Sequence, residues 1–122
     1  MGYLETITDN NWKEFTASPF AVLLVTEKGC THCKAWKAEL SSFLEADSDW
    51  ERWRFGVVTL DGDGVAEFKE ANNPWLEIVE GLPFNAIYVN GAPTTSFYGQ
   101  GVKRLVNRLG RIEGGSEEAV QA

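Results

Sequence analysis

The chain has 122 residues, of which 43% are hydrophobic and 24% charged, and its formal net charge is −7. These values are typical of a single soluble globular domain. The acidic balance argues against binding to nucleic acid or to an anionic membrane, since both need patches of Lys and Arg. No segment approaches the roughly 20 apolar residues of a membrane-spanning helix, and the first residues lack the basic start of a signal peptide, so we expect a cytoplasmic location.

Apolar runs and amphipathic segments alternate along the chain. In chain order we expect a strand at 3–7, a helix around 12–16, a strand at 20–26, a helix between Gly29 and Asp47, a strand at 54–60, a helix at 65–71, strands at 85–89 and 94–98, and a helix at 102–112. The runs 20–26 and 54–60 are apolar without alternation, which is typical of strands buried on both faces. We infer an α/β fold with a mixed sheet between helices.

Proline, glycine and asparagine mark the boundaries of the later elements. Asn72-Asn73-Pro74 is expected to follow the end of the short helix at 65–71, and 75–79 could hold a further turn. Asn90-Gly91 is the strongest hairpin signal in the chain, so the two strands beside it should be antiparallel. Pro93 lies near the start of the returning strand and indicates that this strand is at a sheet edge.

The C-terminal end differs in composition from the rest. Gly114-Gly115-Ser116 opens a polar stretch that lacks the apolar residues needed for a packed element. We therefore expect one domain over 1–112 and a disordered tail over 113–122.

The two cysteines, Cys30 and Cys33, lie where a buried strand gives way to a helix. A separation of three residues at a helix start puts both sulfur atoms on one side of the first turn, so they can close a small disulfide ring. The free N–H groups and the positive dipole end of the helix stabilise a thiolate at Cys30. We expect Cys30 to be the exposed nucleophile and Cys33 to be the more buried thiol that resolves a mixed disulfide.

Thr31 and His32 lie between the two cysteines. A protonated imidazole at His32 would stabilise the Cys30 thiolate, and a more stable reduced form makes the disulfide a stronger oxidant. We predict that these two residues tune the redox potential. The alternative for His32 is a solvated side chain with no redox role.

A metal site is the main alternative for this motif. Structural zinc needs four ligands, and a Cys pair with a single histidine is all that the chain offers as soft ligands, so the site would have to be shared between molecules. An inert pair of core cysteines agrees poorly with the polar neighbours Lys28 and Lys34. We expect no metal and no cofactor.

The segment Cys30-Thr31-His32-Cys33-Lys34, after a buried strand and at a helix start, resembles the active site of the thioredoxin family. A second, independent match follows in the C-terminal half, where Gly81-Leu82-Pro83 precedes a strand, Asn90-Gly91, a return strand and Gly99. The resemblance covers about residues 3–112. It implies a thioredoxin-like three-layer fold, in which a central mixed β-sheet is flanked by helices.

The resemblance also implies a substrate groove. Pro83 would follow a cis peptide bond and face the disulfide, and Leu82 would present its backbone to an extended substrate segment. Gly29 would border the groove beside the first cysteine. Gly99 would form another wall, where a side chain would obstruct approach; an ordinary turn glycine is the alternative at that position.

Three departures from the family's pattern bear on the chemistry. Gly29 stands where thioredoxins usually have Trp, and Thr31-His32 stands where they usually have Gly-Pro. Leu24, six residues before the first cysteine, stands where they carry a buried acid that handles the proton of the resolving thiol. A histidine between the cysteines is more like protein disulfide isomerases and periplasmic oxidases, so the direction of the reaction stays open.

The leading hypothesis is a thiol–disulfide oxidoreductase that acts as a monomer and reduces protein disulfides with the Cys30/Cys33 dithiol. Its partners would be disulfide-containing proteins and a reductase or thiol donor that the sequence does not identify. One alternative keeps the fold but works as a disulfide oxidant or isomerase, which His32 favours. The other is a protein-binding module that uses the groove and has incidental redox activity.

Overall fold

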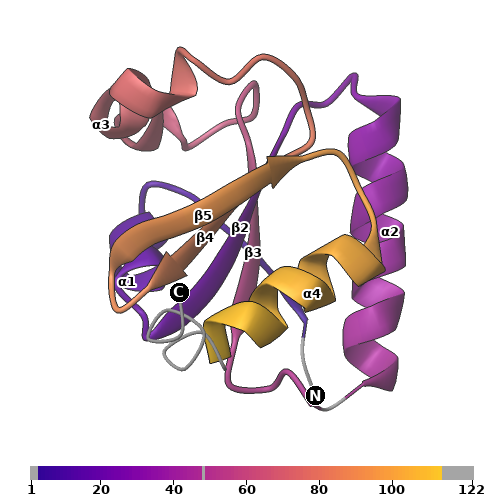
Figure 1. Cartoon of the computed structure of the whole chain (residues 1–122). Coiled ribbons are helices and arrows are strands. Elements are labelled where there is room, and N and C mark those ends of the chain that lie inside the picture. The colour runs from indigo at the N-terminus through magenta and orange to yellow at the C-terminus, as the bar shows by residue number, and fades with distance from the viewer. Residues whose placement is uncertain (1–2, 48, 114–122) are drawn as a thin grey trace.

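The computed structural model describes residues 3–47 and 49–113, which form a five-stranded sheet between two layers of helices (Figure 1). The elements in chain order are β1 (Leu4–Thr6), α1 (Trp12–Thr16), β2 (Phe20–Thr26), α2 (Thr31–Ala46), β3 (Arg54–Thr59), α3 (Ala66–Leu76), β4 (Phe84–Val89), β5 (Ala92–Tyr98) and α4 (Val102–Glu113). This order confirms the predicted alternation of strands and helices and its closing hairpin and helix. Within the described ranges, no helix has the length and apolar character needed to span a membrane.

The strands are arranged in the order β1-β3-β2-β4-β5. β1, β3 and β2 are parallel, whereas β4 pairs antiparallel with β2 and β5 antiparallel with β4. The predicted mixed sheet is therefore confirmed. β2 lies in the middle, and six of its seven residues are buried, which explains why its sequence is apolar without alternation.

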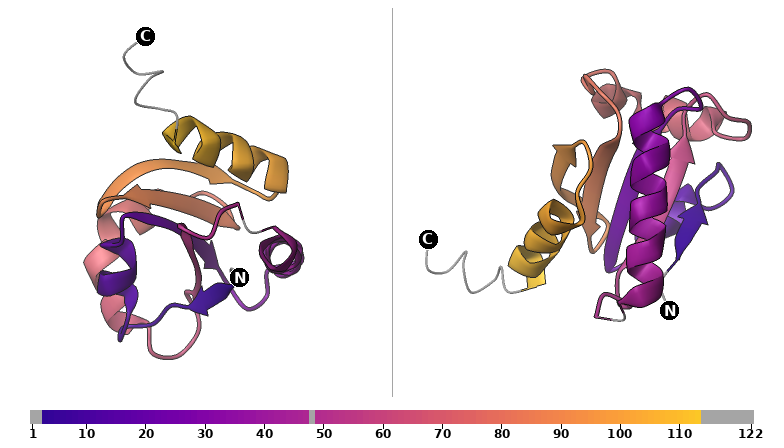
Figure 2. Two further views of the ribbon diagram at one scale, coloured as in Figure 1. Left: turned by 90° about the horizontal axis from the view of Figure 1, so that it is seen from below. Right: turned by 90° about the vertical axis from the view of Figure 1, so that its right-hand side faces the viewer.

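Helices cover both faces of the sheet (Figure 2), and the core accordingly has two halves, one on each face. Successive side chains of a strand point to opposite faces, so β2 contributes to both halves. Val22 and Leu24 pack with residues of α2 and α4. Leu23 and Val25 pack on the other face, with Phe15 of α1 and with residues of α3. Helices on both faces hold β2 rigidly, and the cysteine segment follows directly from its C-terminal end.

The hairpin between β4 and β5 forms as its sequence predicts. Asn90 and Gly91 both have positive φ, 52° and 83°, which is the conformation that the tightest hairpin turns require. Pro93 lies in β5, which is an edge strand and is exposed except at Phe97. The register of the pair shifts between Ile87 and Tyr88.

The prediction that the third helix ends before Asn72-Asn73-Pro74 is wrong, because α3 continues to Leu76 with Pro74 inside it. Asn72 donates its side-chain amide to the Phe68 carbonyl and accepts from the Trp75 indole. The Trp75 ring then packs against Phe68 and Phe84. The packing of this partly buried indole favours the extra turn, although proline removes one backbone donor from it.

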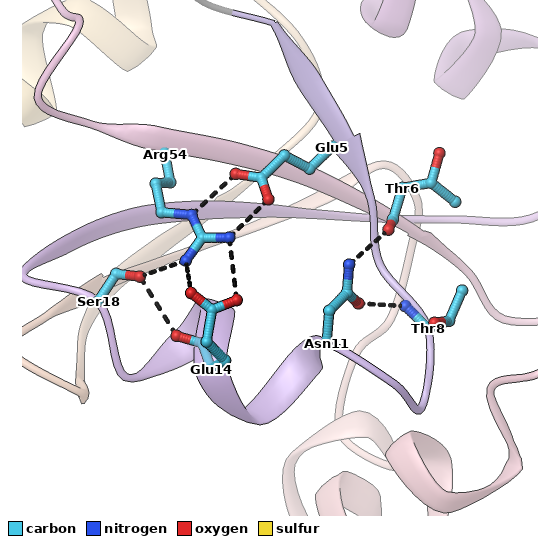
Figure 3. A network of polar contacts seen from close by, with 7 residues as sticks. All are labelled: Glu5, Thr6, Thr8, Asn11, Glu14, Ser18 and Arg54. Atoms are coloured by element: carbon cyan, nitrogen blue, oxygen red, sulfur yellow. Dashed lines mark hydrogen bonds and ion pairs between the residues drawn. The ribbon is translucent and has the colours of Figure 1, made fainter.

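The short strand β1 is attached to the sheet by charged side chains as well as by backbone pairing. Figure 3 shows Arg54 of β3 between the carboxylates of Glu5 and Glu14. Its guanidinium donates to both oxygens of Glu5, at 2.8 Å and 2.6 Å, and also to the Ser18 hydroxyl at 2.9 Å. The hydrogen bond from Arg54 lowers the pKa of the Glu14 carboxyl. This network joins β1, α1 and β3.

The last described residue, Glu113, belongs to α4 rather than to the polar tail. Its carboxylate accepts from Arg52 at 2.8 Å and from the Trp53 indole at 2.7 Å. These bonds fasten the end of α4 to the segment before β3. The remainder of the tail predicted over 113–122 lies outside the described residues.

Candidate active site

Cys30 and Cys33 form a disulfide at the start of α2, with 5.2 Å between their Cα atoms. Cys30 is the N-cap residue of this 16-residue helix, and its Sγ accepts the Cys33 backbone N–H at 3.1 Å. Cys30 is partly exposed, whereas Cys33 is 1% exposed. A thiolate at Cys30 would thus lie at the positive end of the helix dipole, beside a donor already directed at its sulfur.

The loop between β2 and α2 holds Cys30 against the loop that follows β3. The Lys28 backbone N–H donates to the Asp61 carboxylate at 2.9 Å. Within the loop, the Cys30 N–H donates to the Glu27 carbonyl at 3.2 Å. At the end of β2, the Thr26 carbonyl accepts the N–H of Leu60, which follows β3, at 2.8 Å. Hydrogen bonds therefore fix both ends of the loop that precedes α2.

The peptide bond between Leu82 and Pro83 is cis, as the resemblance implied, and it immediately precedes β4. The Pro83 carbonyl accepts the Gly99 N–H at 2.8 Å. Gly99 has a φ of 87°, and a Cβ at this position would lie 3.2 Å from the Arg104 guanidinium. Gly99 therefore provides a backbone conformation that L-residues rarely adopt, and it directly follows the last residue of β5.

An open hollow of about 720 Å³ lies beside Cys30; we call it the Cys30 hollow. Its lining is Glu27, Gly29, Cys30, Leu60, Asp61, Leu76, Val79, Glu80, Gly81 and Leu82. Of the four predicted groove residues, Gly29 and Leu82 line it, whereas Pro83 and Gly99 do not. A Cβ at Gly29 would meet no atom within 4 Å, so the surface beside Cys30 is open to an approaching chain.

Thr31 and His32 are exposed in the first turn of α2. No side-chain hydrogen bond or ion pair joins either residue to another described residue. Their predicted influence on the potential would thus act through space and through solvent.

A second, smaller hollow of about 220 Å³ is lined by Cys33 rather than by Cys30; we call it the Cys33 hollow. Its lining is Thr26, Glu27, Lys28, Cys33, Lys34, Lys37 and Thr59. Sequence reasoning did not assign these lysines to the site. For Lys37 the available signal was its spacing, since it lies four residues after Cys33 and residues four apart share a helix face.

Leu24 is fully buried in the apolar core, and its register partners are Val57 on β3 and Asn85 on β4. Asn85 is also fully buried, but its amide is well paired. It accepts the Trp36 indole N–H at 2.8 Å and donates to the carbonyls of Phe97 and Gly99 at 3.2 Å and 2.9 Å. Sequence reasoning missed Asn85, although a polar residue inside an apolar strand was a signal.

The chemistry available here is exchange between a dithiol and a disulfide. Two sulfur atoms are in covalent contact, one of them is reachable from the Cys30 hollow, and the helix end stabilises its thiolate. Among the described residues, no group of three or more His, Cys, Asp or Glu side chains is placed to hold a metal ion.

The chain matches no protein-family model and no curated protein sequence. It does match solved structures. A thioredoxin of Malassezia sympodialis has a TM-score of 0.72 and 14% identity, with 91% of each chain covered. Thioredoxin f2 of Chlamydomonas reinhardtii has a TM-score of 0.70 and 15% identity, with 88% of this chain and 94% of that chain covered.

A thioredoxin of Trypanosoma brucei brucei has a TM-score of 0.70 and 15% identity, with 91% of each chain covered. All three share the overall α/β fold of this chain. At sequence identities of 14–15%, structural similarity shows a shared fold. The chain has the thioredoxin-like three-layer α/β fold.

Proposed function

We propose that this protein is a thiol–disulfide oxidoreductase that reduces disulfides in other proteins, in the cytoplasm, with the dithiol of Cys30 and Cys33. One observation carries the proposal. The disulfide joins a partly exposed N-cap cysteine to a buried one, at the edge of a hollow that the cis-proline loop also borders. Its donor side would be a reductase or a small thiol, which returns two electrons to the protein in each cycle.

The reaction balances in two exchange steps. The Cys30 thiolate attacks one sulfur of the substrate disulfide, forms a mixed disulfide, and releases the first substrate thiolate. The Cys33 thiolate then attacks Sγ of Cys30, which forms the intramolecular disulfide and releases the second substrate thiolate. Each released thiolate takes a proton from solvent, and the protein is left oxidised by two electrons.

The Cys30 hollow supports docking of an extended protein segment. Gly81 and Leu82 line it immediately before the cis-proline, and Gly29 lines it beside Cys30. The hollow is open rather than enclosed, which suits the approach of a strand-like segment with its disulfide toward Cys30. Substrates would accordingly be disulfide-containing proteins rather than small enclosed ligands.

Reduction of insulin by dithiothreitol tests the proposal. The native protein should accelerate it, and Cys30→Ser should abolish the acceleration. Cys33→Ser is the matched control, since the same chemical change one turn later keeps the attacking thiol but removes the resolving one. It should accumulate a mixed disulfide with the substrate. No acceleration by the native protein, or full activity of Cys30→Ser, would refute the proposal.

Catalysed oxidation or isomerisation is the second candidate function. Thr31 and His32 are exposed in the first turn of α2. His32 favours this function, because a protonated imidazole near the Cys30 thiolate would make the disulfide a stronger oxidant. Equilibration with glutathione decides the direction. A potential near that of thioredoxin, about −270 mV, supports the reductase, whereas a value well above it supports the oxidant.

A further inference from the structure

Among the residues that the structure describes, no buried carboxylate is available to accept the proton of the resolving thiol Cys33. Leu24 occupies the nearby interior position where the sequence resemblance would place a carboxyl, and it packs among apolar side chains. The buried polar side chains among the described residues are those of Ser18, Thr26 and Asn85. None of them is an acid, yet Cys33 is 1% exposed and must lose its proton before it can attack.

The Cys33 hollow provides an exit for that proton. Cys33 contributes to its wall, whereas Cys30 lines the other hollow. The hydroxyls of Thr26 and Thr59 also line it, 3.4 Å apart, with Thr26 donating to the Val58 carbonyl. Its walls therefore offer polar partners to water.

Charge in the Cys33 hollow has the opposite sign to that of the whole chain. Lys28, Lys34 and Lys37 line it against a single carboxylate, that of Glu27, while the chain carries −7. Lys34 and Lys37 come from α2 itself, and Lys28 comes from the loop fixed to Asp61. Cations close to a thiolate favour its ionised form.

We propose that the Cys33 hollow is the route by which Cys33 loses its proton, and that Lys34 and Lys37 are positioning residues that stabilise the Cys33 thiolate in the resolving step. The inference rests on the proposed function. The Cys33 proton passes to water in the hollow, and its sulfur forms a bond to Sγ of Cys30. The bond from Cys30 to the substrate sulfur breaks, and the substrate leaves as a thiolate.

Each charged side chain that lines this hollow either stabilises or destabilises the Cys33 thiolate. Loss of Lys34, Lys37 or Lys28 removes stabilisation of the thiolate, whereas loss of the Glu27 charge removes repulsion from it. Glu27→Gln should therefore speed the resolving step while the lysine variants slow it. His32 is exposed in the preceding turn and does not line this hollow.

A single-turnover experiment separates the two steps. The reduced protein is mixed with dithiodipyridine, an uncharged disulfide that releases one thiopyridone when Cys30 attacks and a second when Cys33 resolves the adduct. The test variant is Lys34→Gln/Lys37→Gln. The control is Lys69→Gln/Lys103→Gln, which removes the same charge from exposed positions on α3 and α4. Circular dichroism establishes that each variant folds.

We expect the second phase of the test variant to be about two- to fivefold slower at pH 7, the range for partly solvated charge pairs. The first phase should change less. Lys34→Arg/Lys37→Arg should restore the rate. The difference should shrink at high salt, because dissolved ions screen the lysine charges.

Three outcomes overturn the inference: a second phase equal to that of the control variant, no restoration by arginine, or a slowing by Glu27→Gln. Loss of the first phase in the native protein is a different result. It would refute the proposed nucleophile, and thus the proposed function.

Discussion

Replacement of Asn85 by leucine removes a buried amide that joins α2 to the β4–β5 hairpin. Asn85 accepts the Trp36 indole N–H at 2.8 Å and donates to the carbonyls of Phe97 and Gly99. Both Asn85 and Trp36 are 0% exposed. Water therefore cannot replace the lost partner unless the core opens.

The expected loss of unfolding free energy follows from these contacts. A buried indole N–H without a partner costs about 1–3 kcal/mol, and each hydrogen bond lost at Phe97 and Gly99 adds about 0.5–1.5 kcal/mol. Apolar burial of the leucine offsets part of this. We expect a net destabilisation of about 2–4 kcal/mol, which lowers the urea midpoint by roughly 1–2 M for a domain of this size.

Urea unfolding followed by circular dichroism measures this loss, and a double-mutant cycle with Trp36→Phe tests its cause. If Trp36 and Asn85 depend on each other, the double variant should recover about 1–3 kcal/mol relative to the sum of the single variants. Strict additivity, or a loss below about 0.5 kcal/mol for Asn85→Leu alone, would refute the reasoning.

Three further predictions follow from the charged and titratable groups. Arg54 lowers the pKa of Glu14 by a hydrogen bond, so this pair stabilises the fold above about pH 4.5 and loses its effect as the pH falls. The difference in Tm between the native protein and Arg54→Gln should thus shrink in acid. Burial raises the pKa of Tyr88 from 10.0 to about 12, so stability should fall as the pH rises from 10 to 12, less steeply in Tyr88→Phe. Glu80 lines the Cys30 hollow with two other carboxylates and no cation among the described lining residues. A peptide disulfide flanked by lysines should therefore be reduced about two- to fivefold faster than one flanked by glutamates at low salt, and Glu80→Gln should reduce this ratio.

Each of these predictions has its own check. Thermal melts between pH 3 and 7 that remain parallel for the native protein and Arg54→Gln would contradict the first. For Tyr88, absorbance of tyrosinate reports the ionisation, and identical alkaline unfolding of Tyr88→Phe would contradict the second. In the third case Glu70→Gln removes a charge from an exposed position on α3 outside the hollow, and an equal effect of this control would exclude a local cause.

Local sequence determines the elements that were predicted well. The run 20–26 is apolar throughout because β2 has strands on both sides and helices on both faces. Asn90-Gly91 predicts the hairpin because its two residues adopt positive φ readily. The Cys30/Cys33 pair belongs to this class too, since its spacing and its place before a helix are visible in the sequence.

Contacts between distant residues determine what the sequence could not predict. α3 passes through Pro74 because Trp75 packs on Phe84, a residue of another element. Trp36 finds its partner Asn85 at a separation of 49 residues. Lysines of α2 and Thr59 of β3 line the Cys33 hollow together. The local sequence pattern of neither segment predicts that they lie side by side.

The pairing of β2 with β4 sets Leu24 directly opposite Asn85. The polar group in this part of the interior is therefore the neutral amide of Asn85, which lies opposite the apolar side chain of Leu24. An amide keeps the same charge over the whole physiological pH range. Among the described residues, the polar side chain that stabilises this part of the core, Asn85, is therefore one that does not take part in proton transfer. A protein engineer could change the stability of this core through Asn85 and the redox behaviour through surface charges, largely as independent variables.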